Sequence, residues 1–241
     1  MPLWQSILVG KILALRANRR CLAVAVSLLA VVAADARAAQ SDLILEAWLA
    51  AQTNLHTWSA DVIQTRSLKA LTQPLVSTGR VWVAIPNHFR WEIGRPAQTI
   101  ALRRPEALFV IYPRLKRAEK YPLDDRRPGP WRDVLALLEA SFPRSRAELD
   151  AFFRVLSVTQ TNGLWCVALQ PKSAQARRMT SGIDVSFRAS DFALAATEMK
   201  FADGSSMRND FTNAVLNPHL PEGCFDAELD PAIQVVEPSK P

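Results

Sequence analysis

Four short segments between residues 76 and 113 alternate apolar and polar side chains with a period of two, and this pattern constrains the fold more than any other feature. Successive side chains of a β-strand point to opposite faces of the sheet, so the alternation predicts four antiparallel strands. The apolar side of one of them carries Phe89, Trp91 and Ile93. A face this rich in aromatic side chains must be covered, either by the protein itself or by a molecule that it binds.

Alternating segments also precede and follow this region and raise the expected number of strands to about eleven. One runs from Trp58 to Ser67, another from Leu115 to Tyr121, and five more lie between Arg154 and Phe211. The dipeptide Asn162-Gly163 is typical of a hairpin turn between two such strands. Residues 171–181 are expected to form a polar loop.

Three segments have helical periodicity instead. The first follows Ser41 and places Trp48 on an apolar stripe. The second follows Pro130 and carries Trp131 and Leu135, and the third begins with a capping box at residues 145–148. Because the helices lie at the start of the chain and in one central segment, the pattern indicates an α+β, mainly β fold in which helices cover an antiparallel sheet.

The first 38 residues have the features of a signal peptide. A basic segment precedes an apolar stretch from Cys21 to Ala34, and Ala36-Arg37-Ala38 fits a cleavage site. The stretch is shorter than the roughly 20 residues of a membrane-spanning helix, so we expect cleavage, with an uncleaved anchor as the alternative. The sequence then predicts one domain over residues 39–230 and a flexible tail over residues 231–241.

Most of the net positive charge of the chain lies in its N-terminal segment. The whole chain has 29 Lys and Arg residues against 23 Asp and Glu residues. The first 38 residues contain five of the basic residues and one of the acidic residues, so the remainder has a net charge of only +2. An excess this small gives no reason to expect a nucleic-acid partner.

Two cysteines, Cys166 and Cys224, follow the signal segment. Export to an oxidising compartment allows a disulfide between them. It would close a loop of about 58 residues and stabilise the fold by about 4 kcal/mol in the chain-entropy model. Two buried, unpaired thiols are the alternative, and the sequence leaves both open.

The sequence has no pattern typical of a catalytic or metal site. The three histidines, His56, His88 and His219, are far apart along the chain, and no serine has the flanking glycines of a nucleophile elbow. No second Cys or His stands at metal-ligand spacing from either cysteine. We therefore expect no enzymatic activity, no cofactor and no metal, with an envelope hydrolase as the alternative.

The aromatic strand pair resembles a known family. The run from Gly79 to Glu92 is similar to a strand pair of the LolA family, the periplasmic carriers of outer-membrane lipoproteins. The segment Trp58–Gln64 resembles the first strand of that family, and both Ile111-Tyr112-Pro113 and Phe211–Asn217 match in order and spacing. Together the matches extend over residues 41–230.

This resemblance implies a half-open antiparallel β-barrel with a lid of about three helices. It implies a monomeric periplasmic carrier that takes acyl chains from an inner-membrane releasing complex to an outer-membrane acceptor, with transient contact to the membrane surface. The side chains expected to line the lipid cavity, with the protein core as the alternative for each, are Trp48, Trp58, Val62, Phe89, Trp91, Leu102, Phe109, Tyr112, Trp131 and Leu135.

Nine basic and four acidic residues lie between positions 103 and 132, which gives this window a net charge of +5. One interpretation is a solvated rim of the barrel. The other is a docking surface for anionic headgroups or an acidic partner, because clustered cations attract such surfaces. Arg114, Arg117 and Arg126 are the candidate docking residues.

The chain departs from the LolA pattern at two positions. Ile85 stands before Pro86 where the family commonly has Arg, and Arg103-Arg104-Pro105-Glu106 replaces the usual Asp-Gly turn. A carrier of another lipid or of a glycolipid is therefore an alternative to a lipoprotein carrier. An envelope regulator that binds a partner protein is a further alternative, although such regulators usually carry an additional C-terminal domain.

Overall fold

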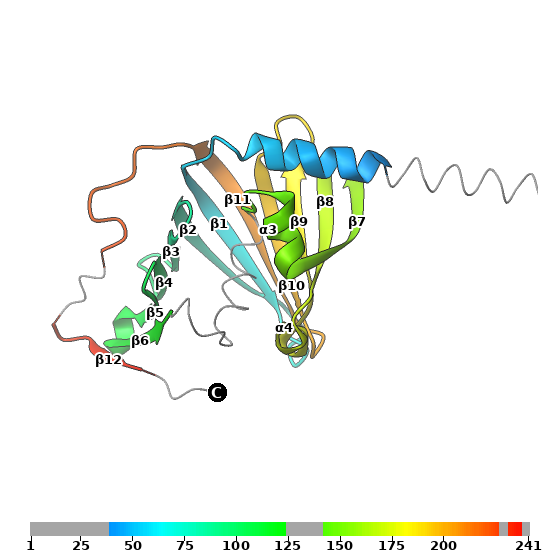
Figure 1. Cartoon of the computed structure of the whole chain (residues 1–241). Helices are drawn as coiled ribbons and strands as arrows, with labels where there is room; N and C mark the ends of the chain where they lie inside the picture. Colours follow the sequence, from blue (N-terminus) through cyan, green and yellow to red (C-terminus); the bar gives the residue numbers. More distant parts are fainter. Residues whose placement is uncertain (1–38, 124–141, 227–230, 238–241) are drawn as a thin grey trace, which may run out of the picture. The chain divides into compact units, whose positions relative to one another are not determined.

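The computed structural model describes residues 39–123, 142–226 and 231–237, and twelve strands in these residues form one sheet (Figure 1). In chain order the strands are β1 (Thr57–Ser67), β2 (Leu75–Ala84), β3 (His88–Ile93), β4 (Thr99–Arg104), β5 (Ala107–Tyr112), β6 (Arg117–Pro122), β7 (Phe153–Thr161), β8 (Leu164–Pro171), β9 (Thr180–Arg188), β10 (Leu194–Phe201), β11 (Ser206–Leu216) and β12 (Gln234–Val236).

The order of the strands across the sheet is β12-β6-β5-β4-β3-β2-β1-β11-β10-β9-β8-β7. Neighbouring strands are antiparallel, except that β12 runs parallel to β6. In the described part of the chain β12 and β7 are the two edges, so the sheet is open. The predicted fold class, a mainly β, half-open antiparallel sheet with a few helices, is confirmed.

One predicted helix start is confirmed in atomic detail. Ser145 caps α3 (Arg146–Phe152), and its hydroxyl oxygen accepts a hydrogen bond from the backbone N–H of Glu148 at 3.1 Å. The Glu148 carboxylate in turn accepts a hydrogen bond from the backbone N–H of Arg144. The Ser145 hydroxyl therefore satisfies a backbone donor that a short helix otherwise leaves free, and the Glu148 carboxylate satisfies one just before the cap.

The other helices agree with the sequence only in part. Residues 39–51 are helical, as expected, and a short 3-10 helix, η1 (Pro113–Leu115), joins β5 to β6. The predicted polar loop at residues 171–181 instead contains α4 (Ala174–Met179), because the Ser173 hydroxyl caps it by accepting from the Ala176 N–H. The predicted helix that carries Trp131 and Leu135 lies outside the described residues.

The chain divides into two compact units, Met1–Leu45 and Glu46–Pro241. The second unit contains the whole sheet and every site discussed below. The predicted signal peptide, residues 1–38, lies outside the described residues. Among the residues that are described, no helix combines the length and the hydrophobicity that crossing a membrane requires.

The strand register gathers aromatic side chains on one face of the sheet. Trp58 of β1 pairs with Val83 of β2, which pairs with Phe89 of β3. Trp91 of β3 pairs with Val81 of β2. We call the face that carries these five side chains the inner face and the opposite one the outer face. The alternation predicted for residues 81–91 thus produces the apolar inner face.

Gly79 brings β2 and β3 close together next to these aromatics. A Cβ atom at this position would lie 1.9 Å from the carbonyl oxygen of Glu92, so no other residue fits without separating the strands. Gly79 pairs with Val62 of β1 on one side and Ile93 of β3 on the other. This glycine therefore sets the spacing of the strands that carry Phe89 and Trp91.

Asn217 fixes the start of β1. Its side-chain oxygen accepts hydrogen bonds from the backbone N–H groups of His56 at 2.8 Å and Thr57 at 3.2 Å. Its side-chain nitrogen donates to the carbonyl oxygen of Asn54 at 2.9 Å. The motif at residues 211–217 thus ends in a residue that holds the beginning of β1, beside Trp58.

The outer face of β4, β5 and β6 has a hydrophobic core of its own. The buried members of this core are Ile100, Leu102, Ala107, Phe109, Ile111 and Ala118. Phe225 and Ile233 from the C-terminal part of the chain pack against it. We call residues 218–226 and 231–237 the C-terminal strap.

The structure of the C-terminal strap differs from the sequence prediction for the end of the chain. Residues 234–236, expected to belong to a flexible tail, form β12 and pair with residues 117–119 of β6. Glu237 also forms an ion pair with Lys120 at 3.6 Å. The apolar side chains beneath the strap explain this order, because they would be exposed to water without it.

Candidate functional site

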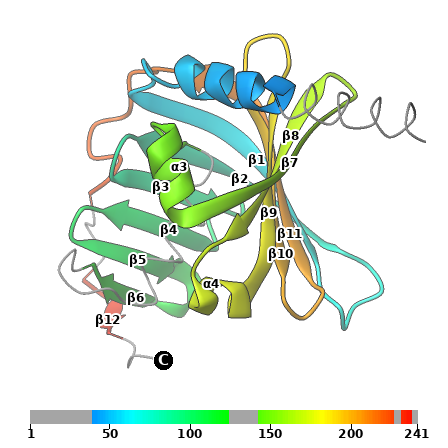
Figure 2. The same ribbon diagram turned by 45° about the vertical axis from the view of Figure 1, so that its right-hand side comes forward.

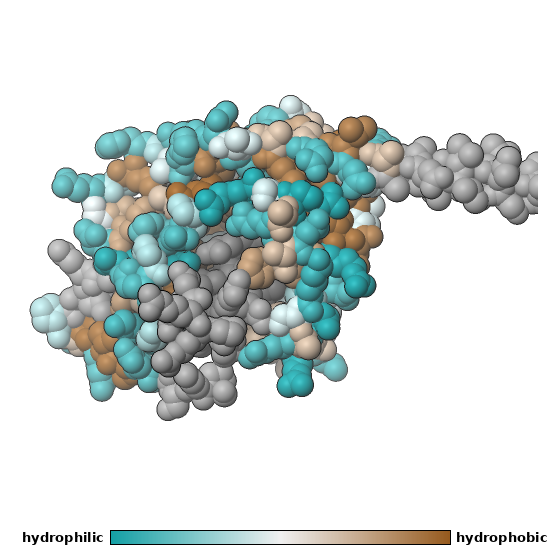
Figure 3. Space-filling model, viewed as in Figure 1, coloured by the Kyte–Doolittle hydropathy of each residue, from teal (hydrophilic) through white to brown (hydrophobic). Residues whose placement is uncertain are grey.

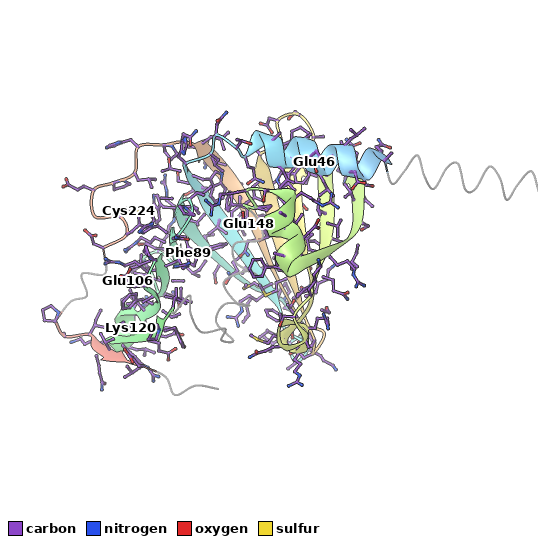
Figure 4. All side chains as sticks on the ribbon, viewed as in Figure 1. Glu46, Phe89, Glu106, Lys120, Glu148 and Cys224 are labelled. Carbon is purple, nitrogen blue, oxygen red and sulfur yellow. The ribbon has the colours of Figure 1, made fainter. Side chains whose placement is uncertain are left out.

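A hollow on the inner face lies between the first three strands and the segment that leads into α3. Its empty volume, including the part that is open to solvent, is about 690 Å³. The side chains that line it are Trp58, Val81, Val83, Ile85, Pro86, His88, Phe89, Trp91, Phe142, Arg144, Glu148, Leu194 and Phe211. Figure 4 marks Phe89 on the strand side and Glu148 on α3, and Figure 2 shows α3 over the strands.

Four aromatic rings form the wall of this hollow. Trp58 contacts Phe142 and Phe211 edge to face, with 5.2 Å between ring centroids in each pair. Trp91 contacts Phe211 in the same manner at 5.9 Å. Phe211 reaches the wall because β11 pairs with β1, where Val62 is opposite Phe211. The wall is therefore apolar and is built from side chains that are distant in sequence.

A second hollow adjoins the first on the side of the N-terminal helix. Its empty volume, again including open space, is about 670 Å³, and it shares Trp58, Phe142 and Leu194 with the first hollow. Trp48 also lines it and stacks on Phe187 of β9, with 5.0 Å between ring centroids and 13° between ring planes. The side chains that the two hollows share are all apolar.

Three buried polar atoms in this region have no hydrogen-bond partner among the described residues. They are Nε1 of Trp58, Nε1 of Trp91 and Nε2 of Gln52. The two indoles line the first hollow, and Gln52 lines the second. A buried donor without an acceptor costs about 1–3 kcal/mol, so three of them in one region form an exception to ordinary protein interiors.

His88 lies at the edge of the first hollow and beside the C-terminal strap. Its ring is 5.4 Å from that of Phe225. Burial of the imidazole lowers the pKa of His88 below its usual value, and the positive charges of Arg104 and Arg103 lower it further. His88 is therefore neutral at neutral pH, which suits the apolar lining.

The structure brings only part of the predicted cavity residues together. Trp58, Phe89 and Trp91 line the first hollow, and Trp48 lines the second. Val62 is buried on the inner face, where it pairs with Phe211 and Gly79. Trp131 and Leu135 lie outside the described residues.

The register corrects the placement of three predicted cavity residues. Leu102 pairs with Arg90 and with Phe109, so both Leu102 and Phe109 point to the outer face and belong to the core under the strap. Tyr112 pairs with Arg117 on the inner face but does not line either hollow. Sequence alternation identifies two faces of a strand, but it does not say which one is covered by a distant segment.

Phe142 and Phe211 are cavity residues that the sequence interpretation missed. Phe211 was detectable, because it ends an alternating segment and lies in the motif at residues 211–217. Phe142 precedes Pro143 outside any regular element, so no periodicity places it. Its contact with Trp58 is a purely tertiary feature.

Nearby acidic side chains pair with part of the basic rim. Arg117 forms an ion pair with Glu119 at 2.8 Å, and Arg104 forms one with Glu106 at 2.9 Å. The Glu119 carboxylate also accepts a hydrogen bond from the Tyr121 hydroxyl at 2.6 Å. These pairs leave less free positive charge than the sequence suggested.

The turn at η1 is the basic part of the rim that extends into solvent. Arg114 and Lys116 are exposed and flank Leu115, of which 72% is accessible to solvent. Lys116 adopts a left-handed backbone conformation with φ of 48°, which ends η1. Arg117 follows directly, whereas Arg126 lies outside the described residues. In Figure 3 the visible face is mostly hydrophilic, with hydrophobic patches between the polar groups.

Cys166 and Cys224 are both free, so the predicted alternative of a disulfide between them is not the one observed. Cys166 lies on β8, and Cys224 lies in the strap near the charges of Arg90 and Glu92 on β3. Five strands lie between β8 and β3 in the sheet order, which places the two thiols in distant parts of the sheet. Burial raises the pKa of both thiols, which makes them poor nucleophiles.

Within residues 39–123, 142–226 and 231–237, no group of three or more His, Cys, Asp or Glu side chains is arranged to hold a metal ion. The site combines an apolar, hollow surface with two indole donors and with polar side chains at its edge, Arg144 and Glu148. Such an arrangement suits the binding of an apolar molecule.

An open antiparallel sheet with an apolar hollow beneath a short helix is the architecture of a LolA-like half-barrel. The chain belongs to the LolA family: the family model described as "Outer membrane lipoprotein carrier protein LolA" matches residues 53–228. No curated protein sequence matches the chain.

Solved structures with a similar arrangement have low sequence identity to this chain. An uncharacterized conserved protein from Thermus thermophilus is 10% identical, with a TM-score of 0.48, over 80% of this chain and 99% of that one. A LolA superfamily protein from Nitrosomonas europaea is 12% identical, with a TM-score of 0.40, over 75% and 96%. A chain of the MucA/MucB complex from Pseudomonas aeruginosa is 13% identical, with a TM-score of 0.41, over 80% of this chain and 62% of that one. The family assignment rests on the match over residues 53–228.

Proposed function

We propose that this protein is a periplasmic carrier that binds the acyl chains of a lipoprotein, or of another lipid, in the hollow on its inner face and moves them from the inner to the outer membrane. The observation that carries the proposal is the aromatic wall of Trp58, Trp91, Phe142 and Phe211 around an apolar hollow. Membership of the LolA family supports it.

The energy of acyl-chain burial limits how such a carrier works. Burial of each CH₂ group contributes about 0.8 kcal/mol, so complete burial of a 16-carbon chain contributes about 12 kcal/mol before costs. A carrier that bound this strongly would not release its cargo. We therefore propose that the chain is only partly engaged and that the hollow widens when its cover moves.

The cover of the hollow is suited to such a movement. α3 has seven residues, and Leu149 is its one buried side chain. The side chains that it and the preceding segment contribute to the hollow include Phe142, Arg144 and Glu148. A helix this short gains its stability from its cap and its packing rather than from its own hydrogen bonds. Opening it therefore requires the loss of few contacts.

Docking to the donor or acceptor membrane is assigned to the turn at η1. The exposed Leu115 lies between two cations, Arg114 and Lys116. Cations near an anionic membrane surface contribute about 1 kcal/mol each, and an adjacent apolar side chain can enter the headgroup region. This surface is smaller than the rim that the sequence suggested, because Arg117 is paired with Glu119.

Native mass spectrometry of the protein purified from cell envelopes tests the proposal. We expect the wild-type protein to carry a species of acyl-lipid mass, and its mass identifies a lipoprotein, another lipid or a glycolipid. The variant Phe142→Asp places a charge in the hollow and should lose the species, whereas Leu156→Asp, on an exposed position of β7, should retain it. A wild-type protein that carries no acyl species, or a bound protein instead, contradicts the proposal.

A further inference from the structure

Two indole N–H groups in the first hollow have no acceptor in the part of the chain that the structure describes, although both are buried. Trp58 is 1% exposed, and the Nε1 atoms of Trp58 and Trp91 lack a hydrogen-bond partner. Indole is a donor only, so its N–H is satisfied solely by an acceptor. The neighbouring rings of Phe142 and Phe211 offer no lone pairs.

The two donors belong to one wall. Both indole rings contact Phe211, and both tryptophans line the same hollow. The strand register holds them there, because Trp58 pairs with Val83 and Trp91 pairs with the nearby Val81. Their positions are fixed by the sheet rather than by a loop, so the donors are in place before any ligand enters.

A hydrocarbon chain does not satisfy these donors. It would fill the hollow and still leave both N–H groups without an acceptor. A free carboxylate would accept, but it would lose its hydration in an apolar hollow that offers little positive charge besides Arg144 at the rim. A neutral carbonyl oxygen accepts a hydrogen bond at a smaller cost of desolvation.

We propose that Trp58 and Trp91 donate hydrogen bonds to the carbonyl oxygens that link acyl chains to their headgroup, so that the site selects acyl esters and amides over plain alkyl chains. This inference rests on the proposed function and adds the chemical class that the site prefers. Tryptophan supplies apolar surface for the chain and a single donor for the linkage in the same side chain.

The second hollow repeats this arrangement with a different donor. Gln52 is 9% exposed, its Nε2 atom has no partner, and it lines the hollow that shares Trp58 with the first. A cargo with more than one acyl chain has more than one carbonyl linkage. Two adjoining hollows, each with an unpaired donor, match such a cargo better than a single fatty acid.

A pair of matched ligands tests the preference. 1-Lauroylglycerol and 1-O-dodecylglycerol have the same headgroup and chain length, but only the first has a carbonyl group. Each is used to displace the fluorescent dye 1-N-phenylnaphthylamine, which contains no oxygen, from the full protein. We expect the wild-type protein to bind the ester at least about five-fold more tightly than the ether, because one hydrogen bond is worth about that factor.

The variants Trp58→Phe and Trp91→Phe remove the donors and keep aromatic rings in the wall. Each should weaken binding of the ester about five-fold more than binding of the ether and the dye, because all three lose the same apolar surface and only the ester loses a hydrogen bond. Trp82→Phe is the matched control, because Trp82 lies on the outer face beside Arg80 and should change neither ligand.

The outcomes separate this inference from the proposed function. Equal binding of ester and ether by the wild-type protein, or an equal loss of both in the Phe variants, overturns the carbonyl preference and leaves the carrier proposal standing. If the wild-type protein binds neither ligand nor the dye, the proposed function fails, and this inference fails with it.

Discussion

Trp58 and Phe142 meet edge to face with 5.2 Å between their ring centroids and 60° between their ring planes. Trp58 is part of β1, and Phe142 lies outside the sheet, three residues before the Ser145 cap of α3. The contact therefore joins the inner face to the start of the helix that covers the hollow. It is therefore one contact between the cover and the wall.

Loss of this contact should loosen the cover. We expect Phe142→Ala to lower the free energy of unfolding by at least about 1 kcal/mol, because aromatic pairs contribute about that much and the burial of the ring is lost as well. Amide exchange in residues 146–152 should accelerate more than exchange in β1. Hydrogen–deuterium exchange followed by mass spectrometry measures both. Leu156→Ala, at an exposed position of β7, is the control, and equal acceleration in the two variants would contradict this role of Phe142.

Removal of the cap of α3 should have a related effect. Ser145→Ala deletes the hydroxyl that accepts from the Glu148 N–H, and loss of such a cap costs about 1 kcal/mol. We expect faster uptake of 1-N-phenylnaphthylamine in stopped-flow fluorescence, because the helix opens more often. Ser173→Ala removes the equivalent cap of α4, which contributes nothing to either hollow, and should leave uptake unchanged. Equal rates for Ser145→Ala and wild type would show that α3 does not limit entry.

The C-terminal strap should be needed for stability. Ile233 packs on the outer core of Leu102 and Phe109, whereas Val235 is 46% exposed. We expect Ile233→Asp to lower the free energy of unfolding by about 2–4 kcal/mol, because it places a charge against an apolar face. Val235→Asp should change it by less than about 1 kcal/mol. Urea titration followed by circular dichroism distinguishes the two, and similar losses in both variants would mean that the strap is not packed as described.

His88 should make the fold less stable at mildly acidic pH. Its pKa in the folded protein lies below the ordinary value of 6.5, so the unfolded chain binds the proton more readily. The free energy of unfolding therefore falls as the pH drops through 6.5 and stops falling below the lowered pKa of the folded state. The variant His88→Gln should lose less stability than wild type between pH 7.5 and pH 5. Urea titrations at both values measure this, with the exposed His219→Gln as control; identical losses in wild type and His88→Gln would contradict it.

Docking through η1 should depend on charge and on salt. We expect Arg114→Glu with Lys116→Glu to reduce binding to anionic phospholipid vesicles at least about five-fold, because each cation contributes about 1 kcal/mol. The loss should shrink at high salt. Arg154→Glu, at an exposed position of the edge strand β7, makes one such charge reversal away from η1 and should bind almost as wild type. Vesicle co-sedimentation measures all three, and equal binding would remove η1 as the docking surface.

The sequence predicted local structure better than it predicted burial. The alternation around Phe89 and Trp91 and the capping box at Ser145 depend on neighbours along the chain, and both are found as expected. Leu102 and Phe109 were assigned to the wrong side, because the segment that covers them contains Ile233, more than a hundred residues later in the chain. Such a contact leaves no periodic signal.

The sequence predicted the kind of side chain that lines the candidate site, but it identified only some of the residues. Trp58, Phe89 and Trp91 were identified because strand alternation aligns them. Phe142 was missed because its position depends on the path of the chain before α3 rather than on a repeating pattern. The unpaired donors of Trp58 and Trp91 were also beyond prediction, since sequence shows a donor but not whether an acceptor lies beside it.

Photochemical cross-linking tests most directly whether the inner face is where acyl chains bind. The wild-type protein is illuminated with a palmitoyl glycerol ester whose chain ends in a diazirine, and the modified residues are mapped by mass spectrometry. Adducts on Trp91, Phe142 and Phe211 are the result that the account predicts. Adducts on the outer core and strap, at Phe109 and Phe225, with none on the inner face would contradict it.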